Sequence, residues 1–426
     1  MDNTFLLRPN VERLKESIET MATFVDETKP GWTRRSFTPW YSKAREWLKE
    51  QMIACGMEVE IDVASNVIGR IPGSNPMFAP IMIGSHTDTV EGGGRFDGII
   101  GVLAGLEIAR RIKETRTVLR HTLEIVDFTS EELSEFGINM IGSRGMVNNL
   151  SQEELDSKDN YGRLLKDVIK KEGGKPDLIT LKSRKRKDVS LYLELHIEQG
   201  PILEQSNNKL AAVTGIVGAH RYYVTVEGRQ NHVGGSPMNM RSDALAGASQ
   251  MIVEFESLCR GNYGGFSLIG SVGKLDIQPN VVTIIPGKVI FSIDIRSLDT
   301  NLLENIIARF KERATEIAGE RGLAVNFESL TKVDAVPVDT EIIDLVEQSC
   351  SSTGKTIRMQ CGSSHDACQI AKIAPIGMIL VSSRDGRSHC PEEWTDYNDV
   401  ALGVEALAKS ILQFDKKIDS NTNFDF

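Results

Sequence analysis

The chain lacks the features that mark membrane-spanning, secreted or disulfide-stabilised proteins. It contains no uninterrupted apolar stretch approaching the roughly eighteen residues that a membrane-spanning helix needs. Residues 1–10 carry an early acid and no apolar core of signal-peptide length. The six cysteines do not have the paired spacing of a disulfide framework or a zinc knuckle. We therefore expect a cytoplasmic protein with free thiols and no membrane partner.

Excess positive charge is also missing. The 49 lysines and arginines are outnumbered by 59 acids, which gives a net charge of −10. A nucleic-acid-binding protein needs a basic face that displaces counterions, so we expect no nucleic-acid partner. The basic run at residues 182–187 is predicted to be a solvated loop.

The first half of the chain alternates predicted strands and helices. Its 426 residues exceed what one hydrophobic core usually supports, so two domains are expected. The expected elements are a helix over 41–55, strands over 57–63 and 66–71 that form a hairpin, a strand over 79–83, a helix over 98–113, a strand over 122–129, a helix from about 142 and a strand over 190–195. This alternation predicts an α/β fold, with a mixed, mainly parallel sheet covered by helices.

The pattern changes near residue 211 and changes back near 333. In between, residues 213–227 and 265–297 alternate in the manner of strands, and helices are expected over 242–258 and 301–318. This order is typical of a small α+β sandwich. Beyond 333, the expected elements are a helix over 341–350, a strand over 376–381 and a helix over 398–414. We therefore predict a domain of residues 1–210 and 333–426 into which a smaller domain, 211–332, is inserted.

Acids and histidines follow the ends of several predicted strands or lie in glycine- and serine-rich loops. The candidate metal ligands are His86, Asp97, Glu132, His196 and His389. The carboxyl edge of an α/β sheet is where such folds place their chemistry, and imidazoles with carboxylates suit zinc. Two divalent ions about 3.5–4 Å apart, sharing one carboxylate, can lower the pKa of a water and polarise a carbonyl. Each residue alone is equally well explained as structural, so the prediction depends on the set.

Two further acids complete the candidate catalytic site. Asp88 lies two residues after His86 on the same face of an extended strand, and we expect it to orient that imidazole. Glu131 and Glu132 are adjacent, so their side chains diverge. We assign Glu132 to the metal and Glu131 to proton transfer between the water and the leaving nitrogen.

The motifs in their order resemble the amidase/carbamoylase branch of the M20 metallopeptidase family. The motifs are His86-Thr-Asp88, Phe96-Asp97-Gly98, Glu131-Glu132, His196-Ile-Glu-Gln-Gly-Pro201 and Ser388-His389. The branch includes N-carbamoyl-L-amino acid hydrolases and allantoate amidohydrolases, and the resemblance covers residues 11–412. It implies two divalent ions per subunit, zinc first with manganese, cobalt or nickel as alternatives. It also implies that the inserted domain is a lid that pairs two subunits into a homodimer.

The resemblance further implies how substrate is held. Gln199 would contact the ureido or carboxylate end of the substrate. His232 would reach the neighbouring subunit's active site and stabilise a tetrahedral oxyanion. Asn280 and Arg296 would hold the substrate carboxylate, for which the planar fork of arginine is suited. Further contacts are expected from a closing loop, at Gly362, Ser363 and His365.

Several of these residues also have simpler structural explanations. Asn280 can cap a turn, and His232 can be a surface histidine in a turn. Arg296 can pair with Asp294 or with Asp299. Without the resemblance, these explanations would be preferred.

The predicted function is that of a dinuclear metal-dependent amidohydrolase. It would cleave a linear amide or ureido C–N bond, as an N-carbamoyl-L-amino acid hydrolase that releases an amino acid, ammonia and carbon dioxide. Residues 133–136, 233–238 and 362–367 depart from the branch pattern beside the expected pocket, which leaves the substrate open. The alternatives are an allantoate or other ureido-acid hydrolase, an aminoacylase or dipeptidase acting on an N-acyl acid, and a catalytically silent metal-binding scaffold. The full ligand set argues against the scaffold.

Overall fold

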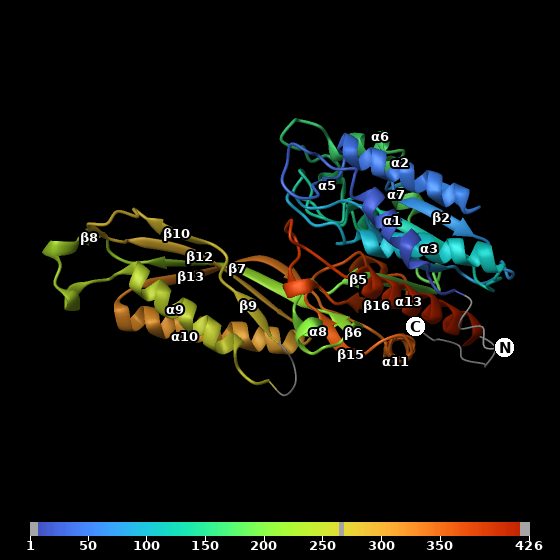
Figure 1. Cartoon of the computed structure of the whole chain (residues 1–426). Helices are drawn as coiled ribbons and strands as arrows, with labels where there is room; N and C mark the ends of the chain where they lie inside the picture. Colours follow the sequence, from blue (N-terminus) through green and yellow to red (C-terminus); the bar gives the residue numbers. More distant parts are fainter. Residues whose placement is uncertain (1–6, 264–267, 418–426) are drawn as a thin grey trace. The chain divides into compact units, whose positions relative to one another are not determined.

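The chain folds into two compact units, each built around its own sheet (Figure 1). The computed structural model describes residues 7–263 and 268–417. The first unit comprises residues up to Thr214, Val338–Met359 and residues from Ser364 onward. The second unit comprises Gly215–Pro337 and Gln360–Ser363. The second unit is therefore inserted into the sequence of the first.

Within the described residues, a nine-stranded sheet belongs mainly to the first unit. Its order is β1-β2-β4-β3-β5-β16-β6-β14, with β15 paired to β6. The strands are β1 Glu58–Ile61, β2 Val67–Ile71, β3 Ile81–His86, β4 Leu123–Phe128, β5 Leu191–Ile197, β6 Leu210–Ile216, β14 Val336–Pro337, β15 Thr356–Cys361 and β16 Ile376–Val381. The central strands β4, β3, β5 and β16 are parallel, whereas β1, β2, β6 and β14 pair antiparallel. The predicted α/β fold with its mixed sheet and β1–β2 hairpin is confirmed.

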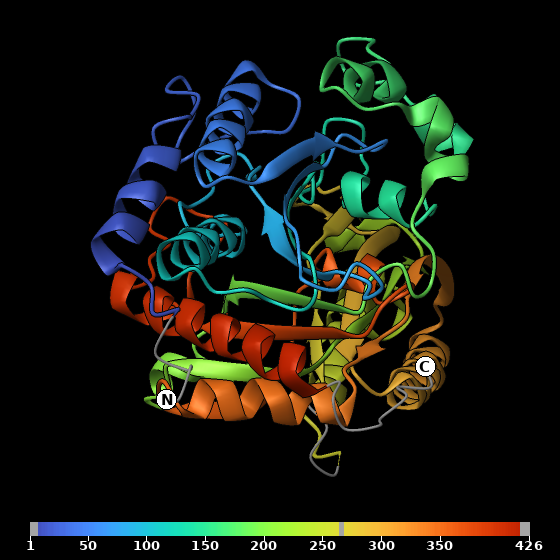
Figure 2. The same cartoon turned by 90° about the vertical axis from the view of Figure 1, so that its right-hand side faces the viewer.

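The central strands are apolar along their whole length because helices cover them. Every residue of β3, β4, β5 and β16 is buried, which is typical of parallel strands covered on both faces. Helix α3 (Ile99–Thr115) packs on β3, β4 and β5, and α13 (Tyr397–Lys417) packs on β5 and β16 (Figure 2). These two helices position the loops that precede them, from which two candidate ligands come.

The other helices of the first unit are mostly short. They are α1 Val11–Met21, α2 Pro39–Ala54, α4 Ile141–Met146, α5 Gln152–Leu155, α6 Leu165–Lys171, α7 Ile179–Lys182, α8 Ile202–Gln205, α11 Thr340–Ser351 and α12 Ala367–Ile370. Helix α2 begins at Pro39, two residues before the predicted start at 41, because the Thr38 side chain accepts from the backbone amide of Tyr41 and Pro39 stands at the first turn. No helix among residues 7–263 and 268–417 is both long and apolar enough to cross a membrane.

The second unit is an antiparallel sheet with two helices packed against it. Its strand order is β10-β12-β7-β13, with β9 on β12, and β8 and β11 form a separate pair. The elements are β7 Gly218–Glu227, β8 Asn231–His232, α9 Ala244–Cys259, β9 Ile269–Ser271, β10 Leu275–Gln278, β11 Ile284–Ile285, β12 Lys288–Ser297, α10 Thr300–Arg321 and β13 Ala324–Val333. Buried side chains of α9 and α10 form one core with the sheet. The pairing of subunits through this unit stays a prediction.

The structure corrects two details of the sequence analysis. Residues 213–227 are not one strand, because the chain leaves β6 of the first sheet at Val217 and enters β7 of the second. The basic run is not simply solvated, because Arg184 forms an ion pair with the buried Glu124 and its side chain is only 16% exposed. Of the predicted strand region 265–297, residues 265–267 lie outside the described residues, and the remainder forms β9 to β12.

Candidate metal centre

The candidate ligands come together in the first unit at the carboxyl edge of its parallel strands. His86 is the last residue of β3, and His196 is the penultimate residue of β5. Glu132 follows the end of β4 by four residues. Asp97 precedes α3, and His389 lies in the turn region before α13. Because β3, β4 and β5 are parallel, their carboxyl ends share one edge, which brings the ligands together.

Asp97 is common to two groups of potential ligands. Its Oδ1 atom lies 3.1 Å from Nε2 of His196 and 3.8 Å from Nε2 of His86. Its Oδ2 atom lies 3.0 Å from Nε2 of His389, and that nitrogen lies 3.1 Å from Oε1 of Glu132. In each group the donor atoms lie within 4.8 Å of one another. One carboxylate thus presents a different oxygen to each group, as a ligand shared by two cations does.

The electrostatics of this cluster fit divalent cations. Burial would raise the pKa of Asp97, but hydrogen bonds from His196 and His389 hold it well below its usual range. Burial opposes charge on His86, yet Asp88, Glu131 and Asp97 hold its pKa well above the ordinary value. The hydrogen bonds to Asp97 and Glu132 raise the pKa of His389 to about 11. The carboxylates therefore favour positive charge at the imidazoles. A zinc ion can supply this charge in place of the protons, because zinc binds nitrogen and oxygen donors of this kind.

Gly98 lets the loop of Asp97 lie close to His86 at the end of β3 and to His196 at the end of β5. Its φ of +70° lies in the left-handed region that favours glycine. A Cβ atom here would lie 2.3 Å from Nε2 of His86, and the amide nitrogen of Gly98 lies only 3.2 Å from Nε2 of His196. Any side chain at this position would displace a candidate ligand.

Asp88 connects His86 with the glutamate pair. The nearest acceptor of the His86 Nδ1 atom is the backbone oxygen of Asp88 at 3.0 Å, and Oδ1 of that residue lies at 3.5 Å. The two carboxylate oxygens of Asp88 accept from the backbone amides of Glu131 and Glu132, both at 3.2 Å. Asp88 thus orients the imidazole chiefly through its backbone, and its carboxylate holds the turn that carries both glutamates.

Glu131 stands beside the cluster but belongs to neither of the two groups that share Asp97. Its Oε2 atom lies 3.8 Å from Nε2 of His86, and the residue is 8% exposed. Burial holds the pKa of Glu131 well above its usual value, and Glu132 adds to the rise. A buried carboxyl group with a raised pKa next to candidate ligands is suited to accept and return a proton.

Gln199 and His365 are the predicted substrate contacts that lie in the first unit. Gln199, at a φ of +57°, donates from Nε2 to Oδ2 of Asp97 at 2.8 Å. The His365 ring is buried 4.3 Å from the ring of His196, measured between centroids. Burial, and to a smaller extent the charge of His196, hold the pKa of His365 well below its ordinary value. Both side chains border the ligands.

The remaining predicted substrate contacts lie in the second unit. They are His232, Asn280, Arg296, Gly362 and Ser363. His232 is exposed on β8, and Asn280 has a φ of +57° after Pro279. Arg296 forms two hydrogen bonds of 3.0 Å with Asp294 and donates to the backbone oxygen of Gly362. The simpler explanation for Arg296 is therefore present in the structure, and its contact with substrate stays a prediction.

Glu194 is part of the site and was missed in the sequence. It lies two residues before His196, on the same face of β5, and is fully buried. It accepts from Ser85 at 2.8 Å and from Tyr192 at 2.9 Å, and it forms a third group of potential ligands with His196 and His365. The sequence indicates this position of Glu194 only through its spacing of two residues from His196, because every second residue of a strand points to the same face.

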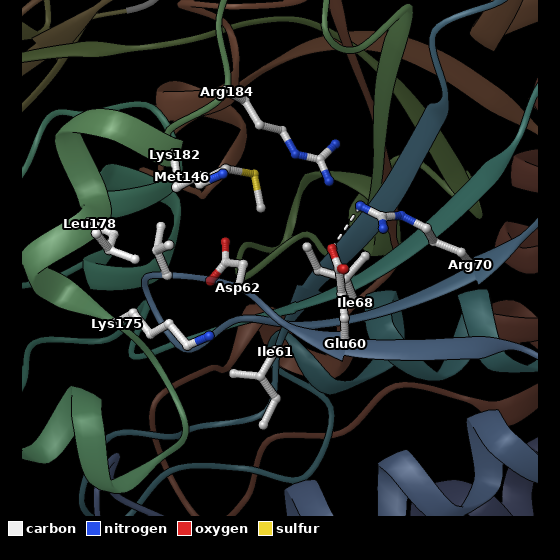
Figure 3. Close-up of a pocket in the computed structure, with 11 residues that line it drawn as sticks. Glu60, Ile61, Asp62, Ile68, Arg70, Met146, Lys175, Leu178, Lys182 and Arg184 are labelled. Atoms are coloured by element: carbon white, nitrogen blue, oxygen red, sulfur yellow. Dashed lines mark ion pairs between the residues drawn. The ribbon is translucent and has the colours of Figure 1, made fainter. Parts of the chain in front are cut away.

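A separate pocket in the first unit does not contain this chemistry. It has a volume of about 340 Å³ and lies between the β1–β2 hairpin and the α7 region (Figure 3). Arg70 forms ion pairs there with Glu60 and Glu124, and the described lining includes no histidine. The candidate reaction centre is therefore the cluster around Asp97.

Comparison with known proteins identifies the family. The profile of peptidase family M20/M25/M40 matches residues 82–413. The chain belongs to this family. An N-carbamoyl-L-amino acid amidohydrolase from Geobacillus stearothermophilus is 36% identical over 403 residues, which cover 94% of this chain and 98% of the relative. An allantoate amidohydrolase from Bacillus subtilis is 34% identical over 397 residues, covering 92% and 95%.

A solved structure agrees with this placement. An amidase of the hydantoinase/carbamoylase family from Burkholderia multivorans matches with a TM-score of 0.90 and 30% identity, over 96% of this chain and 98% of the other. This M20 protein therefore falls in the amidase branch that its motifs predict. Enzymes of the family are metal-dependent, which agrees with the ligand groups around Asp97.

Proposed function

We propose that this M20 protein is a dinuclear amidohydrolase that cleaves a linear ureido C–N bond, with N-carbamoyl-L-amino acids as its substrates. The observation that carries the proposal is the position of Asp97, whose two oxygens face two ligand groups, while Glu131 lies 3.8 Å from His86 of the first group. The relatives named for N-carbamoyl-L-amino acid hydrolysis support the substrate class.

Each ion would have three protein ligands. His86 and His196 with Asp97 would hold one ion, and Glu132 and His389 with Asp97 would hold the other. Zinc is the proposed metal, with manganese, cobalt or nickel as alternatives. When bound, such a pair of ions supplies a water of lowered pKa and a polarised carbonyl group.

Glu131 would carry the proton. Its buried carboxylate takes a proton from the attacking water and returns it to the departing nitrogen. Hydrolysis of an N-carbamoyl group in this way yields an amino acid, ammonia and carbon dioxide. His365 and Gln199 border the same space and would contact the ureido group.

We further propose a homodimer in which the second unit acts as a lid. His232 lies beside exposed apolar side chains, since Met238 is 77% exposed and Val282 is 99% exposed. The segments that carry them are adjacent, because the amide of Val233 donates to the backbone oxygen of Thr283 at 3.1 Å. Such a patch suits contact with a second copy. His232 would then stabilise the oxyanion in the partner's site, while Arg296 and Asn280 hold the substrate carboxylate.

Ammonia release tests the proposal. The purified, metal-loaded protein would be assayed under the same conditions with N-carbamoyl-L-amino acids and with allantoate by ammonia release. N-acyl-L-amino acids, whose hydrolysis releases no ammonia, would be assayed by release of the free amino acid. We expect the first group to have the highest kcat/KM. Faster turnover of allantoate would support the second candidate, which the Bacillus subtilis relative favours. Hydrolysis of N-acyl substrates alone would overturn the ureido assignment.

A further inference from the structure

Glu393 is a buried acid next to the candidate metal centre that the proposed reaction does not use. It is 2% exposed, and it lies in the segment that precedes α13. Its Oε1 atom accepts from the backbone amides of Phe96 at 2.9 Å and of Asp97 at 3.1 Å. A buried carboxylate of this kind is retained only where such bonds compensate its lost hydration.

Glu393 also binds the segment that carries a second ligand. Its Oε2 atom accepts from the hydroxyl of Ser388 at 2.8 Å, and the same hydroxyl lies 3.0 Å from Oδ2 of Asp97. Ser388 is followed directly by His389. One carboxylate therefore connects the loop of Asp97 to the turn of His389, whose Nε2 atom is 3.0 Å from Asp97.

The residues around Glu393 leave room for its carboxylate. A Cβ atom at Gly94 would lie 2.1 Å from Oε1 of Glu393, so this position must lack a side chain. Next to Glu393, the ring of Trp394 packs edge-on against Phe96 with centroids 5.4 Å apart. The two segments therefore also contact each other through these two rings.

We propose that Glu393 is a positioning residue of the metal centre, which sets the separation of the ligands Asp97 and His389 by bonding to both of their segments. The proposal rests on the dinuclear centre proposed above. Groups that hold metal ligands typically change metal affinity by about 10–100-fold when they are removed. Glu393 acts through hydrogen bonds to backbone amides and to Ser388, without touching the ion or the substrate.

The test measures metal affinity, by chelator competition with zinc, and the unfolding midpoint of the same full-length variants. Glu393→Ala is expected to bind the more weakly held ion about 10–100-fold less tightly. Glu393→Gln keeps an oxygen that can accept from both amides, so it should restore binding close to that of the unchanged protein. If Glu393→Ala does not fold, Ser388→Ala decides the matter, because it removes the bond from Glu393 to the second segment together with the contact of the same hydroxyl with Asp97. It should weaken binding by about tenfold.

Asp415→Ala is the matched control. Asp415 is a buried carboxylate of the same unit that also accepts from two consecutive backbone amides, those of Arg120 and His121. Its loss should lower the unfolding midpoint and leave zinc affinity unchanged. Equal zinc affinity in Glu393→Ala and the unchanged protein would overturn the proposal, as would equal losses in Glu393→Ala and Asp415→Ala. A failure of Glu393→Gln to restore binding would also overturn it.

These readouts separate this inference from the proposed reaction. If the unchanged protein binds two ions but hydrolyses no ureido acid, the proposed substrate class is wrong and the role of Glu393 is still decided by affinity. If it binds no divalent ion, the dinuclear centre itself is wrong.

Discussion

Two buried histidine–aspartate pairs of the first unit look alike in isolation and differ in their surroundings. His196 Nε2 lies 3.1 Å from Asp97, and His121 Nδ1 lies 2.7 Å from Asp415. The neighbours of His196 are polar, with the rings of His365 and His86 at 4.3 and 6.0 Å between centroids. The ring of His121 instead lies near two phenylalanines, at 4.9 and 5.7 Å.

The acids of the two pairs differ in the same way. The hydrogen bonds of the Asp415 side chain come from one short segment, because the amides of Arg120 and His121 and the imidazole of His121 donate to it. Asp97 faces imidazoles from three separate segments, namely the end of β3, the end of β5 and the turn before α13. A buried histidine–aspartate pair alone therefore does not indicate a metal site. Convergence of several donors on one carboxylate does.

The largest expected effect separates proton transfer from metal binding within the cluster around Asp97. Glu131→Gln removes the group that would move the proton, so kcat for ammonia release should fall by about 10²–10⁴-fold. The metal content should stay unchanged, because Glu131 belongs to neither group that shares Asp97. Both quantities would be measured on one preparation, with Asp415→Asn as a fully active control. Undiminished turnover would show that Glu131 is not the base.

Alanine substitutions of a histidine beside Asp97 and of the histidine beside Asp415 test the comparison directly. His389→Ala removes a ligand, so one ion should bind at least 10–100-fold less tightly, as even indirect metal partners have effects of about this size. His121→Ala should retain both ions and lower the unfolding temperature. The metal-to-protein ratio at fixed free zinc measures the difference. Loss of an ion from His121→Ala would contradict the distinction between the two pairs.

The contribution of Asp415 should be confined to stability. Asp415→Asn weakens a charged acceptor that is buried with three hydrogen-bond donors, and should lower the free energy of unfolding by about 1–3 kcal/mol. Urea denaturation measures this change. Asp177→Asn is a surface control, since Asp177 is 72% exposed in its pair with Lys170, and it should change stability by less than about 0.5 kcal/mol. If the two substitutions changed the free energy of unfolding equally, Asp415 would have no special role in stability.

The smallest expected effect is a pH dependence. Burial raises the pKa of Asp415, but hydrogen bonds from His121 and two backbone amides outweigh it and hold the pKa below its ordinary value. A carboxyl group with a lowered folded-state pKa stabilises the protein above its unfolded-state pKa of about 3.9. This contribution is lost as the pH falls through the folded-state value. Between pH 5 and 2, unfolding of Asp415→Asn should therefore depend less steeply on pH, and parallel profiles would contradict this.

Local sequence patterns predicted much of the fold and most of the candidate ligands. The alternation of buried strands and helices follows from apolar periodicity, so the central strands and α3, α10 and α13 lie close to where they are predicted. The break at Val217 was missed because the buried end of β6 continues without interruption into the buried start of β7. It marks where the chain changes sheets, which depends on partners distant in sequence.

Other features of the site could not be settled or found from the sequence for the same reason. The pairing of Arg296 with Asp294 was only one of the open alternatives, because a strand places several acids within reach of an arginine. Glu393 gave no local signal, since its partners Phe96 and Asp97 lie about three hundred residues earlier in the chain. Glu194 had a signal in its spacing from His196, but only packing shows that it is turned into the same cluster.

The amino-acid sequence by itself determined the family, the type of fold, and the identity and order of the candidate ligands, because these depend on residue types and on spacing along the chain. The tertiary structure alone decided that Asp97 presents one oxygen to each ligand group and that Glu131 stands outside both groups. It also decided that Glu393 connects the two ligand segments, whereas Asp415 bonds to Arg120 and His121. Those distinctions depend on distances between residues far apart in the chain, which no local pattern records.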